Sequence, residues 1–275
     1  PSTSWWPASA PRRRPRVRPR RRSPRRPAEA PRLRLLSANI QAGHSTRAYR
    51  DYVVRGWGHV LPNGKQRNLD ALAALARPFD IVGLQESDPG SLRSGFTNQT
   101  QALAERGGFP FWSHQPNRRV SRIASSANGL LAREAPTAVF DYALPGRLGG
   151  RGVMLARFGQ GDDAWTLGVT HLSLGVASRR QQIDFLGELL ADEKRAVLMG
   201  DFNCPATSRE FEGLYRRTAL MPPPDRIATF PSWGPTRSLD HVFTAGFRVD
   251  DYRAVPAAGS DHMAVAVTLE PDRPT

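Results

Sequence analysis

The sequence has one cysteine and no long apolar run, and each of these absences excludes a structural feature. Because Cys204 is the only cysteine among 275 residues, an intramolecular disulfide is excluded, and we expect Cys204 to be a small buried filler. No apolar run approaches the ~20 residues that cross a bilayer, and no apolar signal-peptide core is present. We therefore expect a soluble cytoplasmic protein, and a hydrophobic content of 39% is enough for one large core.

The net charge of +14 is concentrated at the start of the chain. Residues 1–32 hold eleven arginines and one acidic residue, a net charge of +10, which leaves about +4 for the remainder. This Arg/Pro-rich composition predicts a disordered tail over residues 1–31. The tail is either a polybasic arm for nucleic acid or anionic lipid or an over-extended reading of the gene. The mildly basic remainder suits a phosphate-bearing substrate without requiring nucleic acid.

Apolar patterning predicts one domain over residues 32–270, followed by a C-terminal tail over residues 271–275. Strands and helices alternate in the first half and paired strands dominate elsewhere, which predicts a layered α/β (α+β) fold with largely antiparallel sheets. The expected strands cover residues 33–43, 80–87, 129–132, 150–158, 164–175, 196–199, 238–246 and the run after 262. The expected helices lie within residues 61–79, 99–106, 178–193 and 208–216.

The sequence AVLMGDFNCP, residues 196–205, is the most informative stretch. Four apolar residues predict a buried strand that Gly200 ends, and Asp201 and Asn203 follow at its end. Because side chains alternate along an extended chain, we expect Asp201 and Asn203 to point the same way, with Phe202 packed behind them. A carboxylate can hold a cation or accept a proton, and a carboxamide can orient a phosphate oxygen or a water molecule. Taken alone, this pair is equally typical of an ordinary polar turn.

Similar polar residues stand at or near the ends of the other predicted apolar strands. Each one alone is more typical of a helix cap, a turn or a structural histidine. Together they supply amide, acid and imidazole groups that suit phosphate hydrolysis. The candidates are Asn39, Glu86, His171, Asp201, Asn203, Asp240, Asp261 and His262.

Seven motifs carry a resemblance to a known family: SANIQAG, IVGLQES, NGLLAR, VTHLS, LMGDFN, SLDH and GSDH. In this order they resemble the endonuclease/exonuclease/phosphatase superfamily over residues 33–269. The resemblance implies a four-layered α/β/β/α sandwich in which two largely antiparallel sheets pack face to face with helices outside. It also implies a hydrolase that cleaves ester bonds with Mg²⁺ or Mn²⁺, at an edge where strand ends converge.

The resemblance implies metal ligands at Glu86, as the main carboxylate, and at its neighbour Asn39, with Asp261 as an additional or water-mediated carboxylate. A hard cation prefers such oxygen ligands. The chain departs from the family at Gln41, where an acid is common. A neutral amide at this position weakens the electrostatic attraction for a cation.

The resemblance also implies the catalytic groups. His262 and Asp240 match a dyad in which the carboxylate fixes the imidazole tautomer. Either His262 or Asp201 is the general base, and Asn203 orients the nucleophile or a phosphoryl oxygen. His171 matches a histidine that contacts phosphate or protonates the leaving oxygen.

The phosphate itself is expected to meet His171, Asn203 and Arg151, because a guanidinium matches phosphate geometry. Arg147 and Arg133 are competing candidates for this arginine. The reaction implied is in-line attack of water on a phosphodiester or phosphomonoester.

The substrate is left open between two branches. A nuclease, and so a nucleic-acid partner, is favoured by the basic tail and by loop residues suited to a nucleic acid. A phosphodiesterase or phosphatase for lipid head groups or small esters is the alternative, and an inactive binding module is a third reading. We expect a monomer. The residues that favour a nuclease are Arg93, Arg118, Arg119, Arg122, Phe111, Trp112 and Trp233.

Overall fold

The computed structural model describes residues 32–272 except 41–61, 91–96, 120–124 and 148. The predicted N-terminal tail, Gln41, Arg93 and Arg122 lie outside the described residues. The helices are α2 (Pro62–Ala76), α3 (Gln99–Gly107), α4 (Val176–Leu189) and α5 (Glu212–Arg217), with short 3-10 turns η2 (Gly161–Asp163) and η3 (Arg209–Phe211). The strands are β1 (Leu33–Asn39), β2 (Ile81–Ser87), β3 (Phe111–Arg119), β4 (Ser125–Ala132), β5 (Ala138–Ala143), β6 (Gly152–Phe158), β7 (Trp165–His171), β8 (Ala196–Asp201), β9 (Asp240–Ala245), β10 (Phe247–Pro256) and β11 (Met263–Pro271).

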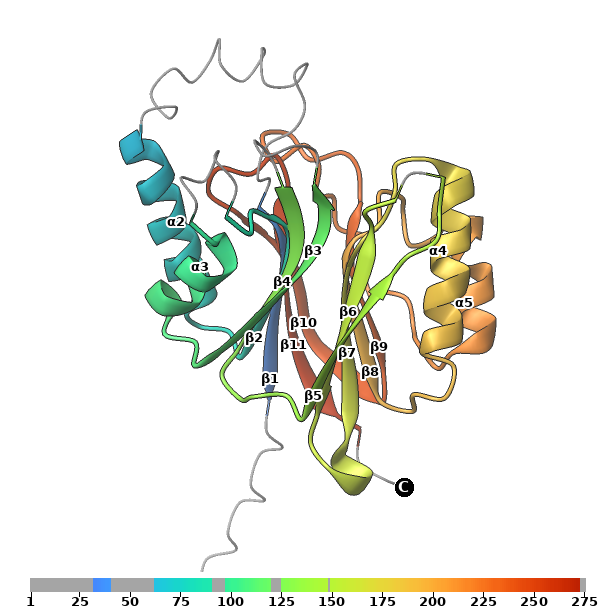
Figure 1. Cartoon of the computed structure of the whole chain (residues 1–275). Coiled ribbons are helices and arrows are strands. Elements are labelled where there is room, and N and C mark those ends of the chain that lie inside the picture. The colour runs from blue at the N-terminus through green and yellow to red at the C-terminus, as the bar shows by residue number, and fades with distance from the viewer. Residues whose placement is uncertain (1–31, 41–61, 91–96, 120–124, 148, 273–275) are drawn as a thin grey trace, which may run out of the picture. The chain divides into compact units, whose positions relative to one another are not determined.

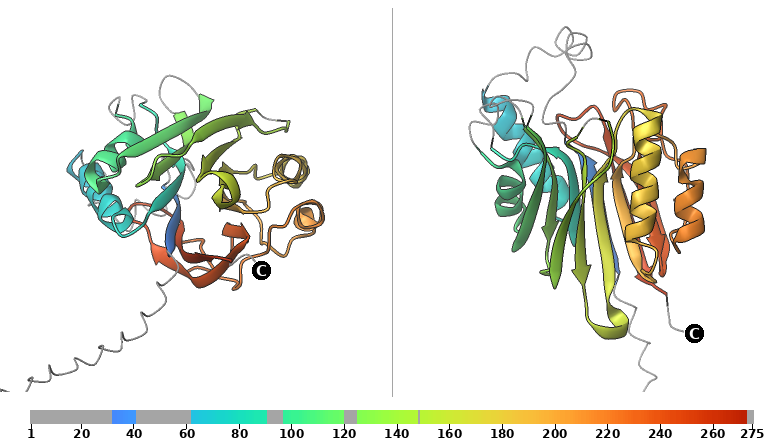
Figure 2. Two further views of the ribbon diagram at one scale, coloured as in Figure 1. Left: turned by 90° about the horizontal axis from the view of Figure 1, so that it is seen from below. Right: turned by 45° about the vertical axis from the view of Figure 1, so that its right-hand side comes forward.

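The strands form two sheets that pack face to face. One sheet has the order β10-β11-β1-β2-β4-β3 and the other the order β5-β6-β7-β8-β9. Among the strands that the structure describes, only the pairs β1/β2 and β7/β8 are parallel. Helices α2 and α3 cover the outer face of the first sheet, and α4 and α5 cover that of the second (Figures 1 and 2). The predicted four-layered α/β/β/α sandwich is confirmed.

Strand β8 illustrates why these residues form a central strand. All six of its residues are buried, and its side chains alternate between two apolar layers. Val197 and Met199 face the core between the sheets, while Ala196 and Leu198 face the helices. A strand covered on both faces carries a continuous apolar run, which is the pattern the sequence displays.

The structure corrects the predicted end of this strand. Gly200 does not end β8, which continues through it to Asp201. Gly200 has a φ of 153°, and a Cβ at this position would lie 1.9 Å from the carbonyl oxygen of Thr170 on β7. Glycine is therefore required here because the neighbouring backbone approaches closely.

Three strands have no counterpart among the predicted ones: β3, β5 and β10. Strands β3, β5 and β10 each lie at the edge of a sheet, where a strand is half exposed and its apolar alternation is weak. Pro116 further obscures β3, because proline cannot donate to the ladder and is tolerated at an edge. Within the described residues, no helix is long and apolar enough to cross a membrane.

Candidate active site

Six of the eight candidate residues meet at one edge of the sandwich, the upper edge in Figure 1. The carboxyl ends of β1, β2, β7 and β8 lie there together with the amino ends of β9 and β11. The Asn39 Nδ2 group donates to Asp201 Oδ2 at 3.1 Å and lies 3.5 Å from Glu86 Oε1. His171 Nε2 lies 3.4 Å from Asp201 Oδ2 and 3.9 Å from Glu86 Oε1. The two sheets thus contribute to a single cluster.

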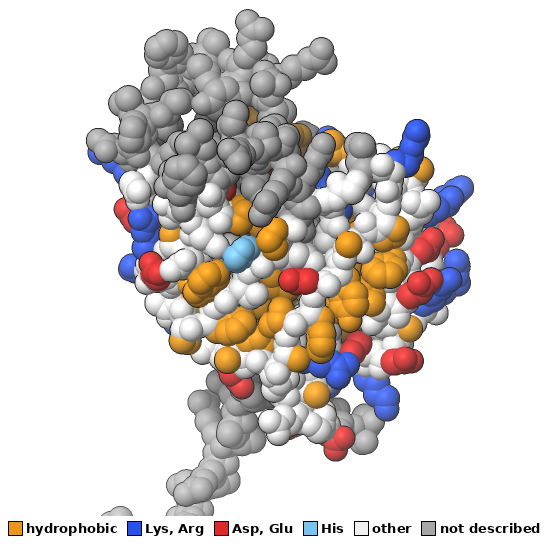
Figure 3. All heavy atoms as spheres, viewed as in Figure 1, with side chains coloured by type: hydrophobic (Ala, Val, Ile, Leu, Met, Phe, Trp, Pro, Cys, Tyr) orange, Lys and Arg blue, Asp and Glu red, His pale blue; other side chains and the backbone are white. Residues whose placement is uncertain are grey.

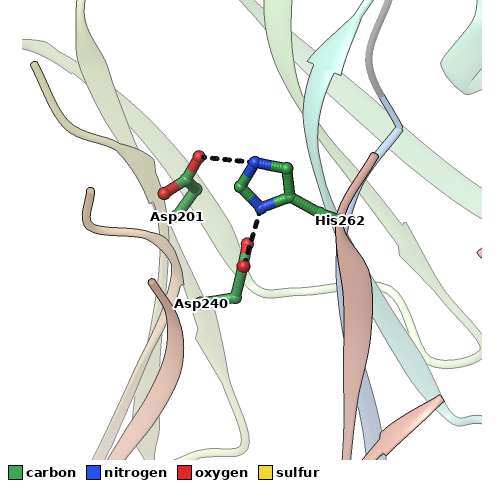
Figure 4. A group of neighbouring side chains, drawn as sticks. All are labelled: Asp201, Asp240 and His262. Atoms are coloured by element: carbon green, nitrogen blue, oxygen red, sulfur yellow. Dashed lines mark hydrogen bonds and ion pairs between the residues drawn. The ribbon is translucent and has the colours of Figure 1, made fainter. Parts of the chain in front are cut away.

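A histidine–carboxylate dyad completes the cluster on its other side (Figure 4). His262 Nδ1 lies 2.8 Å from Asp240 Oδ2, and His262 Nε2 points toward Asp201, with 3.9 Å to its Oδ2. Both side chains of the dyad are buried. Because a carboxylate only accepts, Nδ1 carries the proton of the dyad hydrogen bond, and Nε2 faces the centre of the site.

Supporting residues that the sequence did not reveal hold this dyad in place. Ser260 Oγ donates to the Asn39 carbonyl at 2.6 Å and accepts from the His262 backbone N–H at 3.0 Å. Thr229 Oγ1 accepts from the Asp240 backbone N–H at 3.3 Å. The Phe230 ring packs on the imidazole of His262 with 4.9 Å between centroids. Ser260 lies within the GSDH motif, whereas nothing in the irregular stretch around 229 signals its role.

Two site residues have a left-handed backbone: Glu86 with a φ of 57° and Asn203 with a φ of 56°. Glu86 lies at a register shift between β2 and β4. The strand alternation predicted for 201–203 is wrong for Asn203, whose backbone N–H donates to Asp201 Oδ1 and whose Nδ2 donates to the Leu172 carbonyl. Left-handed backbone outside glycine costs free energy and concentrates at functional sites.

The carboxylates of the cluster destabilise one another. Burial, followed by the charge of Asp240, raises the pKa of Asp201 to about 7. Burial also raises the pKa of Glu86, although the positive charge of Arg151 opposes this effect. Burial raises the pKa of Asp261 as well. Closely spaced carboxylates with raised pKa values form a site that a cation would stabilise.

The two histidines differ in charge. Burial opposes protonation of His262, but the hydrogen bond and charge of Asp240 outweigh it and raise the pKa of His262 to about 10. Burial, reinforced by the positive charge of Arg151, holds the pKa of His171 well below its ordinary value. At neutral pH, His262 is therefore an imidazolium and His171 a neutral imidazole.

Two sets of residues could hold a divalent cation. One is Asp201, Asp240 and His262, whose ligand atoms all lie within 4.8 Å of one another. The other is Glu86 with Asn39, with Asp261 within electrostatic reach of Glu86. In the first set, the hydrogen bond of the dyad already engages His262 and Asp240, so the second set offers the better oxygen ligands for Mg²⁺ or Mn²⁺.

The three arginines predicted as alternative phosphate contacts have different surroundings. The positive charge of Arg151 acts on both Glu86 and His171, so it lies within electrostatic reach of the site. The Arg133 guanidinium instead donates to the carbonyls of Phe79 and Arg77 and packs over an aromatic ring, which gives it a structural role. Arg147 is exposed.

Cys204 is buried and free, as predicted. Burial, followed by the charge of Glu210, raises the pKa of its thiol to about 12. The thiolate form is therefore scarce at neutral pH, which argues against a nucleophilic role.

Comparison with known proteins adds a family and a set of folds. The sequence model described as "Endonuclease/Exonuclease/phosphatase family" matches residues 36–262. No curated protein matches the chain. Among solved structures, an endonuclease/exonuclease/phosphatase family protein from Bacteroides thetaiotaomicron is 19% identical, with a TM-score of 0.65, over 89% of this chain and 100% of that chain.

Two further solved structures have the same fold. The mannosyl-6-phosphatase Bt3783 of B. thetaiotaomicron VPI-5482 is 19% identical, with a TM-score of 0.63, over 86% of this chain and 99% of that chain. A humanized D. rerio TDP2 is 13% identical, with a TM-score of 0.62, over 87% and 99%. At such low identities these likenesses establish the fold alone.

Proposed function

The chain belongs to the endonuclease/exonuclease/phosphatase family, and from this we propose that it hydrolyses a phosphate ester by in-line attack of water. The observation that carries the proposal is that His171 Nε2 lies within 4 Å of a carboxylate oxygen of Glu86 and of Asp201, residues that come from both sheets. Members of this family generally act on phosphoester bonds. The intact set of acids and histidines argues against an inactive binding module.

Asp201 is the better candidate for the general base. A base must be able to accept a proton at working pH, and a pKa near 7 is close to the optimum. Asp201, with a pKa of about 7, meets this condition, whereas His262, with a pKa of about 10, is already protonated. His262 then serves as a fixed positive charge for the phosphoryl oxygens, and Asp240 keeps it protonated and oriented.

His171 and Asn203 would contact the phosphate as neutral donors. A neutral His171 can donate one hydrogen bond to a phosphoryl or leaving oxygen. It is not an imidazolium, so it does not act as a charged general acid. Arg151 adds a positive charge on the same side of the site. Removing one group that stabilises developing charge typically costs about 10²–10³-fold in rate.

Glu86 and Asn39 fit a divalent cation of the Mg²⁺ or Mn²⁺ type, with Asp261 and Asp201 close by. The support is the crowding of carboxylates, because the charge of Asp261 acts on Glu86 and the charge of Glu86 acts on Asp201. When bound, such an ion polarises a phosphoryl oxygen as a Lewis acid.

A direct test measures hydrolysis of bis(p-nitrophenyl) phosphate and p-nitrophenyl phosphate with Mg²⁺, with Mn²⁺ and with EDTA. Asp201→Asn and His262→Ala should each lower kcat by at least about 10²-fold. Asp162→Asn, an exposed acid in η2, is the matched control and should behave as the unmodified protein. Near-normal turnover of either site variant, or full activity in EDTA, would contradict the assignment.

A nuclease remains the second candidate because of one observation. Trp233, 61% exposed, follows Ser232, whose backbone N–H donates to the Asp261 carbonyl beside the dyad. Phe111 and Trp112, by contrast, pack against the core clusters and are unsuited to stack on bases. A substrate panel of plasmid DNA, an abasic duplex, RNA, sphingomyelin and inositol phosphates separates the branches: cleavage of DNA alone would establish a nuclease.

A further inference from the structure

One row of residues crosses the second sheet at the edge that holds the site. His171 on β7 pairs with Asp201 on β8, and Asp201 pairs with Asp240 on β9. The row extends to β6, where the antiparallel register places Gly152 opposite His171, one residue beyond the last pair of the β6/β7 ladder. Gly152 directly follows Arg151, the residue proposed above to contact the phosphate. The backbone of β6 therefore joins the row of candidate catalytic residues to this arginine.

A second row crosses the first sheet and faces the row in the second sheet. Asn39 on β1 pairs with Gln85 on β2, and Asn128 on β4 pairs with Gln115 on β3. Between β2 and β4 the register shifts, so that Gln85 and Glu86 together stand opposite Asn128 alone. Two residues opposite one form a β-bulge, a device that re-aims a side chain. This bulge presents Glu86 to the site.

Three contacts join the two rows across the sandwich. Asn39 meets Asp201 and Glu86 meets His171, as described above. The third contact lies farther along the rows, where Asn128 Nδ2 donates to the carbonyl of residue 152 at 2.9 Å. The first two contacts are made by candidate catalytic and metal-binding groups. The third is made on the backbone next to the proposed phosphate ligand, and nothing above assigns it a role.

The Asn128 amide belongs to a clamp that ties the first sheet to the backbone of the second. Its Nδ2 also donates to Gln115 Oε1 at 3.1 Å and lies 3.4 Å from the Val169 carbonyl. Gln115 Nε2 in turn donates to the carbonyls of Tyr142 and Val153 at 3.2 and 3.1 Å. Connected amides of this kind hold a backbone in one arrangement when they are buried.

The clamp is shielded from water. Asn128 lies on the same face of β4 as Leu130, which packs in the core between the sheets. Asn128 and Gln115 are 0% and 6% exposed, and hydrophobic side chains occupy much of the face over β3 and β5 (Figure 3). Without the Asn128 amide, the Thr170 hydroxyl, which donates to the Gly152 carbonyl at 3.0 Å, would be the remaining side-chain donor to that carbonyl within the described residues.

Arg151 acts on the site from the position that this clamp holds. Its positive charge opposes the rise in the pKa of Glu86 and helps to keep the pKa of His171 low. Glu86 comes from the bulge opposite Asn128, and Arg151 leaves the chain one residue before the carbonyl that Asn128 binds. Asn128 therefore lies between the backbone that carries the carboxylate and the backbone that carries the guanidinium.

We propose that Asn128 is a positioning residue that holds Arg151 in place to bind the phosphate of the substrate. This inference rests on the proposed phosphoesterase function and assigns a role to a residue outside its catalytic groups. Asn128 acts through the Gly152 carbonyl, and hence through Arg151, without contacting the substrate. Removing the Asn128 amide should therefore lower activity only while Arg151 is present.

A double-mutant cycle on the full chain tests this dependence. We compare Asn128→Leu, which nearly keeps the side-chain shape, with Arg151→Ala and with the double variant. The readouts are kcat/KM for bis(p-nitrophenyl) phosphate with Mg²⁺ and the inhibition constant of inorganic phosphate. We expect Arg151→Ala to lower kcat/KM by about 10²-fold and Asn128→Leu by about tenfold, as misplacement of a binding group implies. The double variant should match Arg151→Ala within about threefold, and the inhibition constants should follow the same pattern.

Two further variants separate positioning from folding. Thr170→Val removes the other side-chain donor to the Gly152 carbonyl and should lower kcat/KM by about threefold, an effect that should also disappear in the Arg151→Ala background. Thr100→Val is the matched control, because it removes a buried hydroxyl that lies 2.8 Å from Ser87 Oγ, between α3 and the same sheet. It should keep kcat/KM within about twofold. Urea denaturation checks that each variant is folded, and if Asn128→Leu does not fold, the Thr170→Val cycle decides.

The outcomes separate this inference from the function on which it rests. If the two effects multiply, so that the double variant loses about 10³-fold, the role of Asn128 is independent of Arg151 and the inference is overturned. Near-normal kcat/KM in folded Asn128→Leu, or in Arg151→Ala, would overturn it as well while leaving the phosphoesterase function in place. No turnover of the aryl phosphates by the unmodified protein would overturn both.

Discussion

The buried ion pair between Arg179 on α4 and Glu210 on η3 gives the sharpest test of what holds the second sheet's helical layer together. The guanidinium donates to both carboxylate oxygens, at 3.0 and 2.9 Å. The two side chains are only 7% and 9% exposed. Arg179 also donates to the carbonyls of Leu174 and Ser173, in the loop that follows β7.

The expected magnitudes follow from what each substitution leaves behind. Arg179→Met leaves the Glu210 carboxylate buried without its partner and two carbonyls without their donor, a loss of about 3–5 kcal/mol in the free energy of unfolding. Glu210→Met leaves Arg179 its carbonyl partners, so we expect a smaller loss of about 2–3 kcal/mol. The double variant removes both charges and should lose only about 1–2 kcal/mol, the cost of the orphaned carbonyls.

Urea denaturation of the four proteins measures these values, with an unchanged m-value as the check on two-state unfolding. The double-mutant cycle should give a coupling free energy of at least about 3 kcal/mol. Because a typical domain is stable by about 5–15 kcal/mol, each single loss is easily measured. If the two single losses simply add within about 0.5 kcal/mol, the pair is not coupled and the reasoning is refuted.

Three further predictions concern the backbone and the surface. Glu86→Gly should raise the free energy of unfolding in EDTA by about 1 kcal/mol and abolish activity, because it relieves a left-handed backbone and a buried charge; a less stable variant in a urea titration would contradict this. Gly200→Ala should destabilise by on the order of 3 kcal/mol, measured in the same way, because its Cβ would collide with a β7 carbonyl. Burial raises the pKa of Asp80, but the hydrogen bonds of Arg34 outweigh it and lower that pKa in the fold. Because Arg34 is half exposed, Asp80→Asn should cost only about 0.5–1 kcal/mol at pH 7. The difference between wild type and Asp80→Asn should persist above about pH 3.9 and vanish as the pH falls through the lowered pKa; a constant difference down to pH 2 would contradict it.

The buried central strands and the polar residues at their ends were predictable from the sequence because each leaves a local pattern. Apolar runs such as 81–84 and 196–199 are covered on both faces and so lack alternation. The apolar faces of helices α2 and α4 were also predictable, because their apolar residues recur at helical spacing. The order of the motifs then predicted the fold and the family, because that prediction does not depend on the distance between any two side chains.

Three of the four edge strands were not predictable in this way, whereas the fourth, β9, is buried along its whole length and was predicted. Strands β3, β5 and β10 each pair with a neighbour on one side only. Fewer of their side chains are buried, so the apolar pattern in their sequences is weaker. Strand β5 is the clearest case: three of its six residues are exposed and the other three are half-buried, so no apolar run marks it in the sequence.

In the candidate site, too, some features were predictable from the sequence and others were not. Residue types at strand ends could be named from the sequence, but not their states of charge. These depend on separations between groups that are distant in the chain, such as the 2.8 Å from His262 Nδ1 to Asp240 Oδ2 and the 3.4 Å from His171 Nε2 to Asp201 Oδ2. One histidine becomes a cation because a carboxylate accepts from it, and the other stays neutral because burial and a guanidinium oppose its proton. Since the two residues are the same amino acid, only their surroundings distinguish the charged imidazole of His262 from the neutral imidazole of His171.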